Sequence, residues 1–159
     1  MLQTLFRSCP SRIQIDPALP GPIRHINRER ESAMTTVTTE VETTRKLLQA
    51  ADSDIAAFFE FFSDDCVFRM GNNVSVIGKN AIQSWVAQYL TSVAAMRHEI
   101  VEEWSEGNVA ALRVEVTYTL LNGESFTLPA VTRTRVEQNQ VTEYLIFMDP
   151  SPVVSGTTQ

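Results

Sequence analysis

The second half of the chain consists of four long segments that favour β-strands, and this run constrains the fold more than any other feature. The segments are rich in β-branched and aromatic residues, which suit a pleated, half-buried surface. They cover residues 96–104, 109–121, 124–138 and 141–148, and the turn-like pairs Gly107-Asn108, Asn122-Gly123 and Asn139-Gln140 separate them. The pattern predicts an antiparallel meander of four strands.

The first half of the domain carries helical signals instead. Thr39 and Glu42 resemble a capping box that opens a helix to about residue 51, and Asp52 or Ser53 is expected to cap a second helix. The second helix has a stripe of apolar residues at helical spacing, and a third helix follows Gly78 after a short hairpin of residues 66–77. Helices first and a meander last, without βαβ alternation, predict an α+β fold in which a curved sheet wraps the helices.

Composition limits the number of domains and the class of partner. With 159 residues and 43% hydrophobic content, the chain suits one domain, which we place at residues 37–153. We expect residues 1–36 to be a disordered extension or sequence upstream of a true start at Met34, with an arginine-rich transit peptide as the weaker alternative, and residues 154–159 to be a tail. The net charge of −6 and the lack of a basic stripe argue against nucleic acid or a membrane surface as partner.

The two cysteines, Cys9 and Cys66, form no CxxC pair and accompany no Cys/His cluster. We therefore expect no disulfide scaffold, no metal site and no cofactor, and we expect a cytoplasmic protein.

The turns also predict which residues share a face of the sheet. Two-residue loops at Asn122-Gly123 and Asn139-Gln140 would place Ala130 between Glu115 and Asp149 in one row. The backbones of Glu115 and Asp149 would then be about 10 Å apart. One face would collect His98, Ile100, Glu102, Trp104, Arg113, Glu115, Ala130, Thr132, Leu145, Phe147 and Asp149. A β-bulge in any strand would move part of this set to the other face.

Asp149 is the leading catalytic candidate. Within an apolar cone the pKa of its carboxyl group would rise toward that of a useful base, whereas before Pro150 it can equally cap a turn. Arg113, Glu115 and His98 are further catalytic candidates, although Arg113 and Glu115 can also form ion pairs on a solvated face. The candidate substrate-binding residues, which can equally be core residues, are Phe59, Phe68, Trp85, Tyr89, Trp104, Thr132, Leu145 and Phe147.

The last strand resembles that of the SnoaL-like polyketide cyclases, a family of the nuclear transport factor 2-like superfamily. Those cyclases are similar in having an aliphatic residue followed by Glu at +2, an aromatic residue at +4 and Asp at +8. Val141, Glu143, Leu145 and Asp149 stand at these positions, so Leu145 departs from the pattern. The resemblance covers about residues 38–153. It implies a cone-shaped α+β fold with Asp149 as general base.

The resemblance further implies a cofactor-free cyclase or isomerase that acts on a hydrophobic oxygenated molecule, such as a polyketide, terpenoid or steroid-like compound. Asp149 would take a proton next to a carbonyl group while Arg113 or His98 steadies the enolate. The alternative is a non-catalytic ligand-binding or dimerisation module, and a homodimer suits both. Limonene-epoxide-hydrolase-like proteins resemble the chain at Arg113 and Glu115, but Ile146 occupies the position of their second catalytic Asp.

Overall fold

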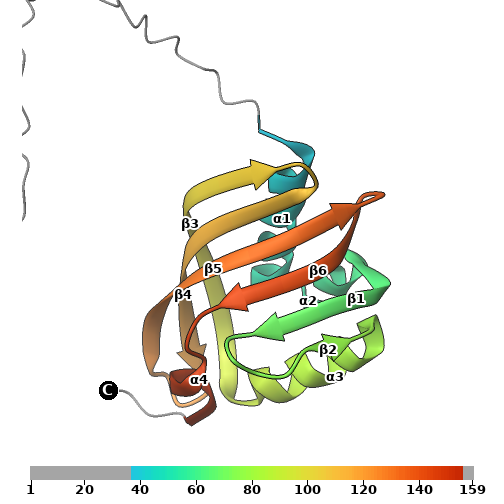
Figure 1. The fold of residues 1–159 in the computed structure, drawn as a ribbon. Helices are drawn as coiled ribbons and strands as arrows, with labels where there is room; N and C mark the ends of the chain where they lie inside the picture. The colour runs from blue at the N-terminus through green and yellow to red at the C-terminus, as the bar shows by residue number, and fades with distance from the viewer. Residues whose placement is uncertain (1–36, 156–159) are drawn as a thin grey trace, which may run out of the picture. The chain divides into compact units, whose positions relative to one another are not determined.

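A curved sheet of six strands carries the helices on its inner face (Figure 1). The computed structural model describes residues 37–155, and the expectations for residues 1–36 lie outside this part. The helices are α1 (Thr39–Ser53), α2 (Ile55–Glu60), α3 (Lys79–Tyr89), η1 (Leu90–Ser92) and α4 (Ser151–Ser155). The strands are β1 (Phe62–Met70), β2 (Val76–Ile77), β3 (Val93–Glu106), β4 (Val109–Leu120), β5 (Ser125–Glu137) and β6 (Gln140–Phe147).

The strands lie in the order β2-β1-β6-β5-β4-β3. Neighbouring strands are antiparallel, except that β1 and β6 run parallel. After β2, at one edge of the sheet, the chain crosses to β3 at the other edge and returns strand by strand to β6. The four C-terminal strands form the predicted meander, and the predicted α+β arrangement of a sheet around helices is confirmed. The strand β3 is a long edge strand of the sheet and packs against α1.

The caps of the first two helices differ from the prediction by one or two residues. Thr38, rather than Thr39, caps α1, because its hydroxyl accepts a hydrogen bond from the N–H of Val41. Asp54 caps α2 by accepting hydrogen bonds from the N–H groups of residues 56 and 57, at 3.0 and 3.1 Å. Neither Asp52 nor Ser53 has this role. The carboxylate of Asp52 is therefore available for another partner.

Two of the predicted turns have a different length or position, which changes the register. The loop between β4 and β5 has three residues, 121–123, since Leu120 pairs with Glu124 through backbone hydrogen bonds. Gly123 has a φ of +87°, which suits the left-handed position of such a loop. The loop between β5 and β6 is Gln138-Asn139, and both residues have positive φ, as in a type I′ turn. The first change shifts the pairing by one residue. The second shifts it by two, and a further register shift between Arg135 and Val136 takes back one of these, so the net shift between β5 and β6 is also one residue.

These shifts correct the predicted faces. Ala130 lies opposite Val114 and not Glu115, and Thr132 lies opposite Leu112, so both point inward. A bulge in β3, between Ile100 and Glu102, turns His98 and Ile100 inward and leaves Glu102 and Trp104 outward. The row that joined Glu115, Ala130 and Asp149 is therefore wrong. Leu145 and Phe147 remain on the outer face with Arg113, because the two shifts around β5 cancel.

The inner face of the sheet and the helices form two clusters of buried apolar side chains. One cluster joins the aromatic residues of α2 and β1 to α3 and β6, including Phe58, Phe62, Phe68 and Tyr144. The other joins α1 to the inward residues of β4, including Leu112, Val114, Val116 and Tyr118, and α4 contributes Val153. A cavity lies between these clusters, and its wall includes residues of both.

Candidate active site

The cavity is bounded by the inner face of the sheet and by residues of α1, α2 and α3. It has a volume of about 40 Å³. Most of its wall is apolar, and the polar side chains that line it are His98, Thr132, Tyr89, Tyr118 and Tyr144. Among the described residues that line the cavity there is no Lys, Arg, Asp or Glu. Apart from any charge on His98, the described wall therefore carries no formal charge.

His98 forms a dyad with Asp52 at the wall of this cavity. The imidazole Nδ1 lies 2.6 Å from Asp52 Oδ1, and the backbone N–H of His98 donates to Asp52 Oδ2 at 2.9 Å. The side chain of His98 is only 9% exposed and that of Asp52 is 21% exposed. Since an ionised carboxylate can only accept, Nδ1 carries the proton in this pair, and in the neutral imidazole Nε2 then carries the free lone pair. The dyad has the arrangement of a general base with an orienting carboxylate.

Asp52 is held in place by the edge strand β3. It lies in the last turn of α1, where the helix dipole does not favour a negative charge. β3 is an edge strand of the sheet, so the N–H groups along its free edge have no partner strand. Asp52 accepts one of these N–H groups, that of His98, and the imidazole of the same residue. The two hydrogen bonds fix the imidazole relative to the cavity.

The tyrosine hydroxyls provide neutral hydrogen-bond donors in the same cavity. The hydroxyl of Tyr89 donates to that of Tyr118 at 3.4 Å, and Tyr118 contacts the sulfur of Met148 at 4.0 Å. Burial raises the pKa of Tyr89 to about 12, and burial also raises the pKa of Tyr118 and Tyr144. These groups are therefore protonated at neutral pH. They can donate to an oxygen atom of a ligand but cannot act as bases.

Flexible side chains occupy part of the wall. Met70, Met96 and Met148 all line the cavity. Unbranched thioether side chains adapt readily to a changed volume. Ligand pockets usually have volumes of about 300–1,000 Å³, so the cavity must widen to admit anything larger than a few water molecules. Rotation of the methionine side chains is the least costly way to widen it.

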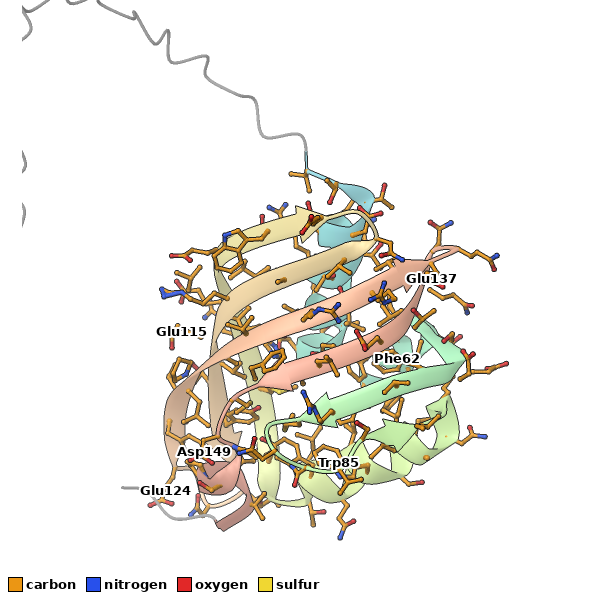
Figure 2. The ribbon with its side chains drawn as sticks, viewed as in Figure 1. Phe62, Trp85, Glu115, Glu124, Glu137 and Asp149 are labelled. Carbon is orange, nitrogen blue, oxygen red and sulfur yellow. The ribbon has the colours of Figure 1, made fainter. Side chains whose placement is uncertain are left out.

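The cavity brings together five residues that the sequence singled out. His98, Phe68, Trp85, Tyr89 and Thr132 all line it. Trp85 stacks on Tyr89 with ring centroids 5.4 Å apart, and it also contacts Phe68. Figure 2 shows Trp85 on α3, beneath the sheet. The proposed substrate-binding role of these residues remains a prediction, and their position agrees with it.

The other candidate residues lie outside the cavity. Phe59 is part of the aromatic core and does not line the cavity wall. Trp104, Leu145, Phe147, Arg113 and Glu115 belong to the outer face of the sheet. Glu115 is directly opposite Glu99 and extends from the outer side of β4 (Figure 2). Arg113 Nε is 3.9 Å from Glu102, close enough for an ion pair but too far for a hydrogen bond.

Asp149 is exposed and lies just beyond the end of β6 (Figure 2). Its carboxylate accepts a hydrogen bond from the backbone N–H of Ser151 at 3.0 Å. This hydrogen bond lowers the pKa of Asp149 from its usual value. Asp149 borders a surface hollow with Asn72 and Asn73, not the cavity. Its role as general base thus stays a prediction, without burial to support it.

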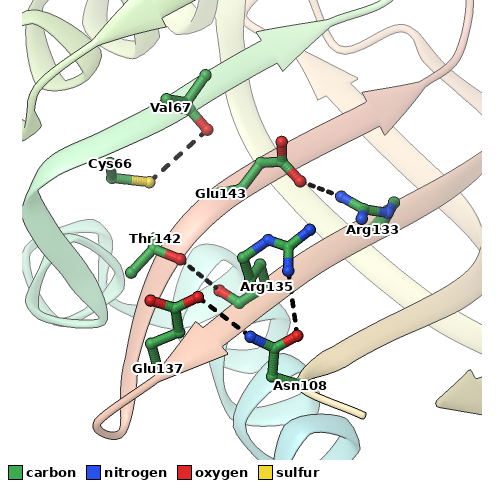
Figure 3. A network of polar contacts seen from close by, with 8 residues as sticks. All are labelled: Cys66, Val67, Asn108, Arg133, Arg135, Glu137, Thr142 and Glu143. Atoms are coloured by element: carbon green, nitrogen blue, oxygen red, sulfur yellow. Dashed lines mark hydrogen bonds and ion pairs between the residues drawn. The ribbon is translucent and has the colours of Figure 1, made fainter. Parts of the chain in front are cut away.

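A network of polar contacts on the outer side of the sheet accounts for other charged residues (Figure 3). Arg133 donates to Glu143, the residue at the +2 position of the last-strand pattern. Arg135 donates to Asn108, which in turn donates to Glu137. These contacts connect β5 to β6 and to the turn between β3 and β4, and none of these residues lines the cavity. They stabilise the sheet rather than the site.

Sequence reasoning missed Asp52, Tyr118 and Tyr144. Asp52 was interpreted from the sequence as a possible cap of the second helix, although Asp54 is only two residues away. The available signal was that Asp54 can cap α2 equally well, which leaves one carboxylate without a local role. Tyr118 and Tyr144 are not in the set predicted to share a face with His98 and Asp149, so the error in register concealed them.

Within residues 37–155, no group of three or more His, Cys, Asp or Glu side chains is arranged to hold a metal ion. In the same part of the chain, no helix has both the length and the apolar character needed to cross a membrane.

Comparison with solved structures identifies the class of fold. An NTF2-like protein of unknown function from Burkholderia pseudomallei is 18% identical, with a TM-score of 0.66 over 77% of this chain and 99% of that one. A candidate SnoaL-like polyketide cyclase from Jannaschia sp. CCS1 is 18% identical, with a TM-score of 0.65 over 76% of this chain and 93% of that one. An epoxide hydrolase of the LEH-like type from M. tuberculosis is 12% identical, with a TM-score of 0.62 over 74% and 87%.

The molecule thus has the cone-shaped nuclear transport factor 2-like fold, as the resemblance implied. Its sequence matches the profile of the SnoaL-like domain over residues 28–144, and the chain belongs to that family. Comparison with curated proteins gives no match. At these identities the structural neighbours define the fold, and the chemistry has to be argued from the site.

Proposed function

We propose that this protein binds an uncharged, mostly apolar molecule with a carbonyl oxygen in the cavity, and that His98 moves a proton to or from the carbon next to that carbonyl. The observation that carries the proposal is the dyad of His98 and Asp52 in the wall of an apolar cavity. Imidazole is the side chain best suited to proton transfer near neutral pH. The reaction class is a cofactor-independent isomerisation or cyclisation.

The proton transfer uses groups that are in place. Nε2 of His98 takes the proton from the carbon, and the imidazolium that forms is stabilised by the carboxylate of Asp52. The electron pair left on carbon moves into the carbonyl, and the enolate oxygen accepts a hydrogen bond from a tyrosine hydroxyl such as that of Tyr118. Return of the proton to another carbon gives an isomer. Attack of the enolate carbon on a second carbonyl of the same molecule closes a ring.

The uncharged character of the substrate follows from the wall. A carboxylate or phosphate would enter a mostly apolar cavity in which no described residue supplies a Lys or Arg side chain. Burying such a charge without a partner is very costly. A hydrophobic oxygenated compound, for example a polyketide, terpenoid or steroid-like molecule, requires only the hydroxyls and the imidazole.

The test is exchange of the α-protons of a ketone panel in D₂O, followed by NMR. Cyclohexanone and 1-tetralone serve as neutral probes. We expect the protein to accelerate exchange, and His98→Gln to reduce this acceleration about 10²- to 10⁴-fold, the usual contribution of a general base. Asp52→Asn should also reduce it, because the amide can donate to Nδ1 and reverse the tautomer. Glu115→Gln, on the outer face, is the matched control and should leave the rate unchanged.

Asp149 is the competing base, and the same assay separates the two candidates. Support for Asp149 comes from the last-strand pattern, and support for His98 comes from burial and contact with the cavity. If Asp149→Asn abolishes exchange while His98→Gln retains it, the base is Asp149 and our assignment is wrong.

A non-catalytic module is the second candidate, and two observations favour it. The cavity of about 40 Å³ is small, and the outer face exposes Trp104 and Phe147 at 50% and 48%. Exposed aromatic residues are typical of interfaces. This alternative predicts a homodimer that Trp104→Ala dissociates in sedimentation experiments, and no exchange with any ketone of the panel.

A further inference from the structure

Three surface hollows share lining residues with the cavity. The hollow beside Asp149 shares only Met148 with it, and the other two are the candidates for its mouth. The first lies at the corner where α1 meets α2, against η1 and the start of β3. It shares four lining residues with the cavity: Ala51, Ile55, Leu90 and Met96. The second lies beside α3 and α4 and shares Trp85 and Tyr89 with the cavity. A residue that lines two spaces stands in the wall between them, so each set marks a possible passage.

The second passage is closed by rigid side chains. The rings of Trp85 and Tyr89 stack with an interplanar angle of 14°, and Tyr89 donates a hydrogen bond to Tyr118. Trp85 also packs on Phe68, with ring centroids 5.1 Å apart. Opening this wall would break all three contacts. Aromatic pairs contribute about 0.5–1.5 kcal/mol each beyond their buried area.

The first passage is closed only by small or flexible side chains. Ala51 is small, and Leu90 and Met96 are unbranched at Cβ and can change rotamer. Ile55 is the first residue of α2 and is 42% exposed, so its side chain stands at the rim of the hollow. None of the four takes part in a ring contact or a side-chain hydrogen bond among the described residues. These four side chains can therefore move without loss of a ring contact or a side-chain hydrogen bond of their own.

The dyad spans the first passage. Asp52 lines the outer hollow, whereas its partner His98 lines the cavity. Met96, which belongs to both spaces, precedes His98 by two residues and points to the same face of β3. A molecule that passes Ile55 and Met96 therefore reaches the imidazole next.

We propose that ligands enter through the hollow at the corner of α1 and α2, and that Ile55 is the specificity-determining residue at this mouth, because its side chain limits what passes. The inference rests on the proposed function in so far as the cavity is the binding site. The hollow carries Asp52 and Asp54 and, among the described residues, no Lys or Arg. An anionic ligand therefore meets no opposite charge on this route.

The experiment measures the association and dissociation rates of 4-fluoroacetophenone, a neutral one-ring ketone, by fluorine NMR line shape and relaxation dispersion. Ile55→Trp should slow both rates about tenfold, equivalent to about 1.4 kcal/mol in the barrier, with a much smaller change in Kd. Ile55→Ala should accelerate both. Val154→Trp is the matched control, since Val154 is an exposed residue that lines the second hollow. It should leave the rates unchanged. 4-Fluorobenzoate, the anionic counterpart, should not bind.

The outcomes distinguish this inference from the proposed function. Slower exchange in Val154→Trp but not in Ile55→Trp would place the mouth beside α3 and overturn the inference. Unchanged rates in both tryptophan variants, with circular dichroism showing that both are folded, would also overturn it and would leave the cavity as a binding site. Failure of the unmodified protein to bind the ketone would reject the cavity as a binding site, and the mouth with it.

Discussion

The two faces of the same strands differ in almost every property. Along β4, the inward residues Leu112, Val114, Val116 and Tyr118 are at most 2% exposed, and the alternate residues Arg113, Glu115 and Thr117 are on the outer face. The outer face has the ion pairs of Arg113 with Glu102 and of Arg133 with Glu143, and further carboxylates such as Glu115. The cavity on the inner side has one imidazole and a few hydroxyls.

This difference shows that the density of charged residues is a poor guide to the site in this fold. Charged side chains gather where water solvates them, and there an ion pair contributes only about 0–1 kcal/mol. On the inner face a single polar group is conspicuous because burial must be compensated by a specific partner, and Asp52 provides it for His98. The three predictions below test how far the two faces differ, beginning with the largest effect.

The first prediction compares an inner with an outer phenylalanine. Phe68→Ala should reduce the free energy of unfolding by about 3–5 kcal/mol, because the side chain is 1% exposed and leaves a void beside the cavity. Phe147→Ala should cost about 1 kcal/mol or less, since it loses mainly the contact with Arg69, whose guanidinium is 6.0 Å from the ring centroid. Urea unfolding measures both. Equal losses would show that the outer face is also packed, for instance by a second subunit.

The second prediction concerns alkaline pH. Burial raises the pKa of Cys66 and of Tyr89 to about 12 in the folded protein, whereas the unfolded chain ionises these groups near 9 and 10. Above these values the unfolded state has lost protons that the folded state keeps, so stability should decrease as pH rises from about 9 to 12, by up to about 1.4 kcal/mol per pH unit for each group. The urea midpoint between pH 7 and 11 measures this.

Tyr89→Phe is the control for the alkaline effect, because it removes one ionisable hydroxyl from the cavity wall and retains the ring. The variant should lose less stability than the unmodified protein between pH 10 and 11. A midpoint that stays constant up to pH 11 would contradict the burial of these groups.

The two faces were predicted unequally well from the sequence. The order and type of the longer helices and strands followed from apolar periodicity and from the turn pairs, and the structure confirms them. The short elements η1 and α4 were not predicted. The assignment of faces did not follow, because the extra residue in the loop after β4, the bulge in β3 and the register shift between β5 and β6 each exchange the inner and outer residues up to the next such change. Nothing in Asn122-Gly123 distinguishes a loop of two residues from a loop of three.

The site was lost through the same errors. His98 was identified, but with Glu115 and Asp149 as companions, whereas its partner Asp52 comes from the end of α1, 46 positions earlier. A hydrogen bond between a helix end and an edge strand depends on how the two elements pack. No local pattern in the chain encodes this contact.

The third prediction concerns acidic pH and has the smallest effect. The hydrogen bond from Ser151 lowers the pKa of Asp149, so carboxyl-resolved NMR should find a value below about 3.9, the value of model peptides. The stability that this group contributes is present above the unfolded pKa and is lost as pH falls through the folded pKa. The loss should be slight, since the carboxylate is exposed. A raised value that responds to a ligand would instead restore Asp149 as the base.

The bulge at Val101 determines where the length of β3 can change. Residues before the bulge alternate in one phase, with Met96, His98 and Ile100 inward, and residues after it alternate in the opposite phase. Removing Val101 would merge the two phases and leave every other side chain on its present face. Removing Glu99, with the bulge kept in place, would exchange the inner and outer side chains of β3 on one side of the deletion. The strand therefore tolerates a deletion at Val101, and a deletion a few positions earlier would place a different residue beside Asp52.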